Sequence, residues 1–108
     1  MNNRWHGFIG RYGPEGNKLW EGFYENGFKD QKGVEYYELD DAFGVPNLKK
    51  IDGFWKKGKL HGNDIKFYDN KGILRFEGPY SDDKREGLGT VYNVDGSLEF
   101  CAVFKQGK

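Results

Sequence analysis

The chain has few of the residues from which disulfide-stapled domains, long helices and hydroxyl-based catalytic sites are built. Its 108 residues include one cysteine, one methionine, two alanines, two serines and one threonine. A lone cysteine, Cys101, cannot form an intramolecular disulfide, which excludes a small stapled scaffold and favours a reducing compartment. No apolar run reaches the length of a signal-peptide core or a transmembrane helix, so we expect a cytoplasmic protein.

An excess of charge of one sign is also missing. The 17 basic and 17 acidic side chains cancel, which removes the electrostatic argument for a nucleic-acid partner. Glycine and aromatic residues are abundant instead, with 17 Gly, nine Phe, seven Tyr and three Trp. This composition disfavours helices and implies that large rings supply much of the buried surface.

Four segments of the chain superpose on one another. Each centres on an anchor residue, and the spacings between anchors are 31, 25 and 24 residues. The anchors are Gly22, Gly53, Gly78 and Ala102. An apolar residue precedes each anchor by two positions and an aromatic residue follows it by two. This register predicts a half repeat at 5–17, whole repeats at 19–44, 50–73 and 74–97, and a closing half repeat at 98–108.

Apolar residues within each repeat recur at every second position, which predicts strands. Trp20, Gly22 and Tyr24 share one face of such a strand, and turn formers such as Asn26-Gly27 separate one strand from the next. We expect an all-β fold, a single elongated, twisted antiparallel sheet of about eight strands in stacked β-hairpins. In the second strand of each hairpin, the residues expected on the same face are Val34 and Tyr36, Ile65 and Phe67, and Thr90 and Tyr92.

The anchor glycines predict a slot in which a large ring from the adjoining strand lies flat. A single sheet has no second layer to cover these rings, so we expect its aromatic face to be partly exposed. We also expect the terminal strands, near 7–12 and 98–105, to be edges that attract further strands.

The motif Leu/Ile-x-x-Gly-x-Trp/Tyr-x-x-Gly, followed by a strand that ends in Tyr, resembles the MORN (membrane occupation and recognition nexus) repeat. The best matches are 50–72 and 74–96, and the resemblance covers nearly the whole chain. It implies glycine-rich and aromatic-rich hairpins that stack into an extended sheet with a groove. Departures from the glycines of the pattern occur at Gln31, Asp64, Asp83 and Ala102. They indicate a divergent member, similar also to bacterial MORN-variant proteins.

Residues for catalysis and metal binding are scarce. His6 and His61 occupy equivalent repeat positions, which indicates a structural use, and neither Ser97 nor Cys101 has a base nearby in the pattern. The sequence has no zinc-type ligand spacing. We therefore expect no enzymatic activity, no metal and no cofactor.

Three surfaces are candidate binding sites. The first is the aromatic face, where we expect most rings to form core and Trp55 and Tyr80 to lie at a groove rim; its residues are Trp20, Tyr24, Trp55, Phe76, Tyr80 and Phe104. The second is an insertion loop at 40–49 with six or seven extra residues and four contact candidates, Phe43, Val45, Pro46 and Leu48. The third is a basic patch of Lys49, Lys50, Lys56, Lys57 and Lys59. Cross-strand pairing with the acidic segment 30–41 is the alternative use of these lysines.

We expect a non-enzymatic protein-interaction or scaffold module that binds a protein partner through the aromatic groove or a sheet edge. That partner could be a second copy of the chain. An adaptor for anionic membrane lipids is the first alternative, because the resemblance implies that activity and the lysines could serve it. A small bacterial or phage inhibitor, similar to an antitoxin, is the second.

Overall fold

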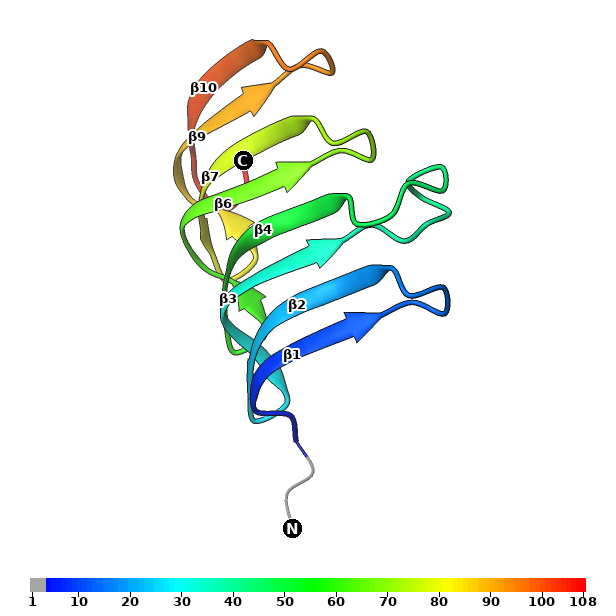
Figure 1. The fold of residues 1–108 in the computed structure, drawn as a ribbon. Coiled ribbons are helices and arrows are strands. Elements are labelled where there is room, and N and C mark those ends of the chain that lie inside the picture. The colour runs from blue at the N-terminus through cyan, green and yellow to red at the C-terminus, as the bar shows by residue number, and fades with distance from the viewer. Residues whose placement is uncertain (1–3) are drawn as a thin grey trace.

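The computed structural model describes residues 4–108, which form one open antiparallel sheet without a helix. The strands are β1 (Gly7–Tyr12), β2 (Lys18–Glu25), β3 (Phe28–Tyr36), β4 (Lys49–Lys56), β5 (Lys59–Leu60), β6 (Gly62–Tyr68), β7 (Leu74–Ser81), β8 (Lys84–Arg85), β9 (Gly87–Tyr92) and β10 (Leu98–Phe104). Eight of them follow chain order across the sheet, while β5 pairs with β4 and β8 with β7. The predicted all-β fold of stacked hairpins is confirmed (Figure 1), with two short strands beyond the eight expected.

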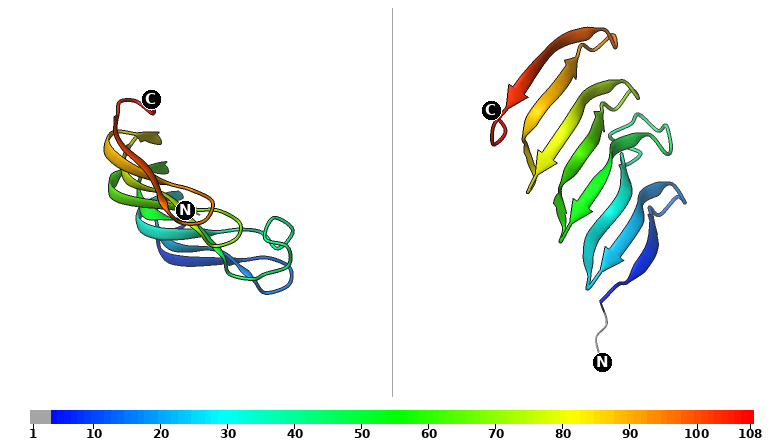
Figure 2. Two further views of the ribbon diagram at one scale, coloured as in Figure 1. Left: turned by 90° about the horizontal axis from the view of Figure 1, so that it is seen from above. Right: turned by 90° about the vertical axis from the view of Figure 1, so that its left-hand side faces the viewer.

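The sheet is curved along its strands, as both views in Figure 2 show. The second strand of each hairpin contains one residue in the left-handed region of φ. These residues are Gly7 (φ 86°), Gln31 (φ 67°), Gly62 (φ 153°) and Gly87 (φ 108°). A left-handed residue redirects a strand, so the turn end of each hairpin bends toward one face and makes that face concave.

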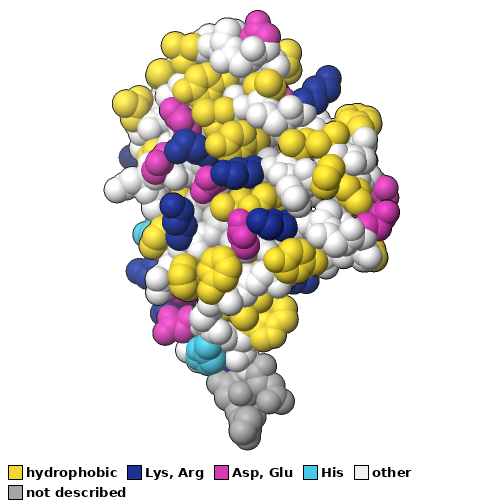
Figure 3. Space-filling model, in the orientation of Figure 1, with side chains coloured by type: hydrophobic (Ala, Val, Ile, Leu, Met, Phe, Trp, Pro, Cys, Tyr) yellow, Lys and Arg dark blue, Asp and Glu magenta, His cyan; other side chains and the backbone are white. Residues whose placement is uncertain are grey.

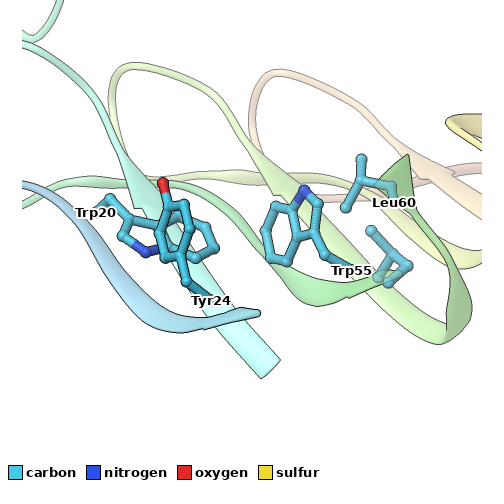
Figure 4. Packing of buried hydrophobic residues seen from close by; sticks show 5 residues of the cluster. Trp20, Tyr24, Trp55 and Leu60 are labelled. Carbon is cyan, nitrogen blue, oxygen red and sulfur yellow. The ribbon is translucent and has the colours of Figure 1, made fainter. Parts of the chain in front are cut away.

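The concave face carries the predicted rings, and most of them are buried. Trp20 and Phe76 are each 2% exposed, which confirms that most rings form core, whereas Trp55 at 4% exposed does not lie at an exposed rim. The ring centroids of Trp20 and Trp55 lie 4.9 Å apart and those of Phe76 and Phe104 5.7 Å apart, both pairs edge to face. Curvature of the sheet brings the rings against one another (Figure 4).

A side chain seven residues after each of the three anchor glycines covers these rings. Lys29 Nζ lies 4.3 Å from the ring centroid of Trp20, and the Arg85 guanidinium lies 4.1 Å from that of Phe76. Leu60 is buried in the same cluster as Trp55. Trp5 holds the equivalent position in the first half repeat, with its ring 5.1 Å from that of Tyr24. We call Trp5, Lys29, Leu60 and Arg85 the lid residues.

The lid residues also tie each hairpin to the next. Their main-chain carbonyls accept hydrogen bonds from the amides of the following turn, with N–O distances between 2.8 and 3.0 Å. The donors are Gly27 to Trp5, Gly58 to Lys29, Asp83 to Leu60 and Gly107 to Arg85. The clasp repeats four times, so the cover over each ring depends on the neighbouring repeat.

Glycines on paired strands provide the slots for two of the rings. A Cβ atom at Gly89 would lie 2.7 Å from Cε1 of Phe76, and one at Gly33 would collide with the indole of Trp20. In the middle repeat, the smaller Ile51 replaces the large ring. Ile65, which is fully buried, fills the space left there. The predicted slot is therefore confirmed in the first and third repeats and filled by an aliphatic side chain in the second.

One register prediction is wrong. Ile65 and Phe67 face the core, but Tyr36 and Tyr92 face the convex side, where their hydroxyls donate to Glu21 and Glu77. Val34 and Thr90 also lie on the convex side, one residue away from the buried Gly33 and Gly89. The cause is a bulge between Gly62 and Ile65, which shifts β6 by one residue. An ungapped alignment of repeats does not detect such a shift.

Asp83 stands where the other turns have glycine, and its side chain makes an additional hydrogen bond. The four turns at the curved ends of the hairpins have two successive residues with positive φ, and the second is Gly27, Gly58, Asp83 (φ 71°) or Gly107. A non-glycine residue in this region is strained. The carboxylate of Asp83 accepts a hydrogen bond from the amide of Leu60 at 2.7 Å, which adds a contact that glycine could not make.

The Gly33→Ala substitution tests the slot. It should lower the free energy of unfolding by about 2–3 kcal/mol, because the added methyl collides with the buried indole of Trp20. Gly10→Ala is the matched control in β1, where the added methyl would meet only the exposed ring of Tyr12. Urea denaturation at neutral pH measures both; equal losses would contradict the slot.

Candidate functional site

A hollow of about 430 Å³ lies on the concave side over β1 to β4. Glu35 lines it, and its carboxylate binds Lys29 at 3.1 Å and Lys50 at 3.8 Å. Arg11 and Trp20 also line it, and the indole Nε1 of Trp20 is buried without a hydrogen-bond partner. Acidic and basic groups balance here, so the hollow suits a polar or zwitterionic segment better than a highly charged ligand.

The predicted aromatic groove is a packed core. Trp20, Tyr24, Trp55, Phe76 and Phe104 are all buried. Trp55, expected at the rim, is thus among the least accessible rings. Tyr80 is half-buried and stacks on Phe67 with 5.3 Å between centroids. In this conformation the six predicted residues offer a partner little more than part of Tyr80.

The insertion loop is a folded extension of the β3–β4 connection. The amide of Tyr37 donates to the carbonyl of Leu48 at 2.9 Å, and equivalent bonds close the other three long connections. Eleven positions separate Tyr37 from Leu48, against four in each of the others, so the loop carries seven extra residues. The buried Ala42 anchors it, and Asn47 Oδ1 accepts from the amide of Lys18 at 2.9 Å. Figure 1 shows the loop extending outward between β3 and β4.

The four predicted contact residues of this loop divide into two kinds. Phe43, Val45 and Pro46 are exposed to solvent. Leu48 is half-buried, and it lies against Gly72 of the adjoining connection. The loop therefore presents three apolar side chains on a fixed backbone.

The five lysines do not form one patch. Lys49 and Lys50 lie at one end of β4, where they pair with Asp52 at 3.5 Å and Glu35 at 3.8 Å. The others, Lys56, Lys57 and Lys59, lie around the turn at the opposite end, roughly 20 Å away for an extended strand. Figure 3 shows basic and acidic side chains interspersed across the visible face. The cross-strand alternative is confirmed for Lys50 and Glu35.

Strand β10 has an exposed outer edge. Phe100 occupies the repeat position of Trp20 and Phe76, yet it is 46% exposed. Leu98 and Val103 of the same strand are exposed as well. Within residues 4–108 no strand pairs with the outer side of β10. An apolar strand with unpaired backbone groups is a surface to which another strand binds readily.

The convex face carries a row of apolar side chains that none of the three predicted sites includes. Its sequence signal is an apolar residue directly after every anchor, a position that the alternation pattern assigns to the solvent side. Adjacent second strands contribute two more members. The convex row consists of Phe8, Phe23, Phe54, Pro79, Leu88 and Val103.

Beside this row, the buried Tyr36 and the half-buried Tyr92 hydrogen-bond to carboxylates. The hydroxyl of Tyr36 donates to Glu21 at 2.5 Å, and that of Tyr92 donates to Glu77 at 3.0 Å. Burial, followed by the bond to Glu21, raises the pKa of Tyr36 well above its ordinary value. The bond from Tyr36 lowers the pKa of Glu21 below its ordinary value of 4.5, although partial burial opposes this. These pairs are structural.

The two histidines have equivalent structural settings. His6 Nδ1 accepts from the amide of Asn26 at 3.5 Å, and His61 Nδ1 lies 3.9 Å from Asp82 in the next turn. No group of three His, Cys, Asp or Glu residues in the described chain is arranged to hold a metal ion. Over the same residues, no helix is long and apolar enough to cross a membrane.

Comparison with known proteins adds no relative. No protein-family model matches the chain, and no curated protein matches it. The fold and the surfaces described above therefore carry the functional argument.

The Tyr36→Phe substitution should lower the free energy of unfolding by about 1 kcal/mol at pH 7, because it removes a partly buried hydrogen bond to a carboxylate. The depressed pKa of Glu21 contributes stability that is present above pH 4.5 and is lost as the pH falls below it. The variant should therefore lose less stability between pH 7 and pH 3 than the unmodified chain, as measured by urea denaturation.

Tyr12→Phe is the control, since that ring is exposed. Parallel pH profiles for Tyr36→Phe and the unmodified chain would show that the bond does not set the pKa of Glu21.

Proposed function

We propose that the chain is a non-enzymatic protein-interaction module that binds another polypeptide at the outer edge of β10. The observation that carries this proposal is Phe100, which is exposed at a position where β2 and β7 bury their rings. A strand added beside β10 would satisfy its backbone groups and cover this ring at the same time.

The internal repeats specify what the added strand should look like. In the two hairpins that bury a ring at this position, the covering strand places a glycine opposite the anchor, as Gly33 does opposite Gly22. It also supplies a cationic lid residue, Lys29 or Arg85. We expect a partner strand with a small residue opposite Ala102 and a long side chain reaching Phe100.

Other parts of the molecule are consistent with this role. The insertion loop presents Phe43, Val45 and Pro46 as a second apolar contact. Stacked hairpins in a single sheet are also what the MORN resemblance implies, and members of that kind serve as scaffolds. We propose the cytoplasm as the place of action, because the lone Cys101 suits a reducing compartment.

The lipid-adaptor alternative has less support. An anionic membrane attracts clustered cations with roughly 1 kcal/mol per residue near the surface. Here the five lysines are separated along β4, and Lys49 and Lys50 are each paired with a carboxylate. The inhibitor alternative is a special case of protein binding, and the identity of the partner decides it.

A pull-down from a lysate of the source cells, read by mass spectrometry, tests the edge. A specific partner should be recovered with the unmodified chain and reduced at least tenfold with Phe100→Lys, because a charge on the edge opposes burial of the added strand. Val94→Lys is the matched control in the β9–β10 turn, where the side chain is 73% exposed.

Equal recovery with Phe100→Lys would place the contact elsewhere. Recovery of no specific protein with the unmodified chain would contradict the proposal itself.

A further inference from the structure

We propose that the convex row binds the convex row of a second copy of this chain, in a two-fold dimer separate from the contact at β10. Phe8, Leu88 and Val103 are 62%, 66% and 75% exposed, and Phe54 is 47% exposed. The core lies on the opposite face, so intramolecular packing does not account for the row. Such rows on a soluble sheet mark interaction surfaces.

The row has an apolar pair at each end. Phe8 lies opposite Phe23 in the β1–β2 register, with ring centroids 5.4 Å apart. Leu88 lies opposite Val103 in the β9–β10 register. Near the middle, Phe54 is the apolar member, and Lys32 of β3 lies opposite it in the register. A two-fold axis parallel to the strands, lying between β4 and β6, reverses the strand order and superposes one end pair of a copy on the other end pair of its partner.

The curvature of the sheet permits this contact. The strands bend along their length (Figure 2), whereas the convex row crosses them in the direction of stacking. Two convex surfaces whose rows are aligned therefore meet along the full row, as two cylinders meet along a line. A contact crossing the rows would touch at one point only, so the rows must be aligned, and the two-fold axis parallel to the strands aligns them.

Charged residues next to the row are consistent with the same two-fold axis. Asp52 on β4, which also pairs with Lys49 at 3.5 Å, lies opposite Lys66 on β6, which also pairs with Asp64 at 3.1 Å. The two-fold axis brings Asp52 of one copy near Lys66 of the other, twice. The net charge of zero also leaves no overall repulsion between copies. A membrane surface, the other occupant of an apolar row, lacks this matched pairing.

The surface area buried between the two copies determines the expected affinity of the dimer. Large apolar side chains offer on the order of 150–250 Å² each when fully exposed, so the measured exposures give roughly 500 Å² per copy. Two copies then bury about 1,000 Å² from the row alone, near the lower limit for a specific interface. We therefore expect a weak dimer with a dissociation constant in the range of about 10–100 μM.

Sedimentation equilibrium of the whole chain between about 10 and 500 μM tests the proposal. The apparent mass should rise from 12.5 kDa toward that of two chains. Leu88→Lys should raise the dissociation constant at least tenfold, because it places a charge in each end contact. Val94→Lys adds the same charge at a similarly exposed position away from the row and should leave it unchanged. Thermal denaturation checks that both variants fold.

An unmodified chain that stays monomeric over this range would overturn the proposal. So would dimerisation that persists in Leu88→Lys and is lost in Phe100→Lys, because that result assigns the contact to the edge of β10. The row would instead be a membrane contact if three results were found together: the unmodified chain binds vesicles of anionic phospholipid, Leu88→Lys abolishes this binding, and the mass stays at that of one chain. Partner capture at β10 is independent of these outcomes.

Discussion

A large ring lying across two glycines on paired strands is the contact on which the rest of this structure depends. Trp20 lies over Gly22 and Gly33, and Phe76 lies over Gly78 and Gly89. Without Cβ atoms, the ring reaches the backbone itself and buries most of its surface against it. A single sheet obtains a core in this way without a second layer, provided that something covers the other side of each ring.

Curvature and the lid residues supply that cover. The left-handed residue in each second strand bends the hairpin, and the clasp from each lid carbonyl to the next turn holds the bend in place. Each repeat therefore completes its neighbour, which is the general condition for stability in repeat proteins. The same logic explains why Phe100, at the edge strand, remains exposed while Trp20 and Phe76 are buried.

The sequence predicts the repeat architecture well, because spacing and alternation depend only on local geometry. It predicts the strands, the hairpin order, the glycine slots and the six or seven extra residues of the insertion loop. The curvature is not predictable from the same signals, since Gly62 and Gly87 look like ordinary strand glycines and Gln31 adopts the same conformation without being glycine. The prediction of Trp55 at a groove rim is therefore wrong, because its ring is 4% exposed.

Two further features required the three-dimensional register. The bulge before Ile65 moves β6 by one residue, so a side chain that aligns with a convex position enters the core. The convex row was visible as an apolar residue after each anchor, but alternation alone assigns only one face as apolar. Both features show that a repeat pattern identifies equivalent residues in the sequence but does not determine which face of the sheet each side chain occupies.

Acrylamide quenching of tryptophan fluorescence in a Trp5→Phe variant tests the central claim most directly, because it leaves only Trp20 and Trp55 as emitters. Since both indoles are covered by curvature and lids, we predict blue-shifted emission and a quenching constant several times smaller than that of the urea-unfolded chain. Red-shifted emission with quenching equal to that of the unfolded chain would contradict a curved sheet that buries its own aromatic face.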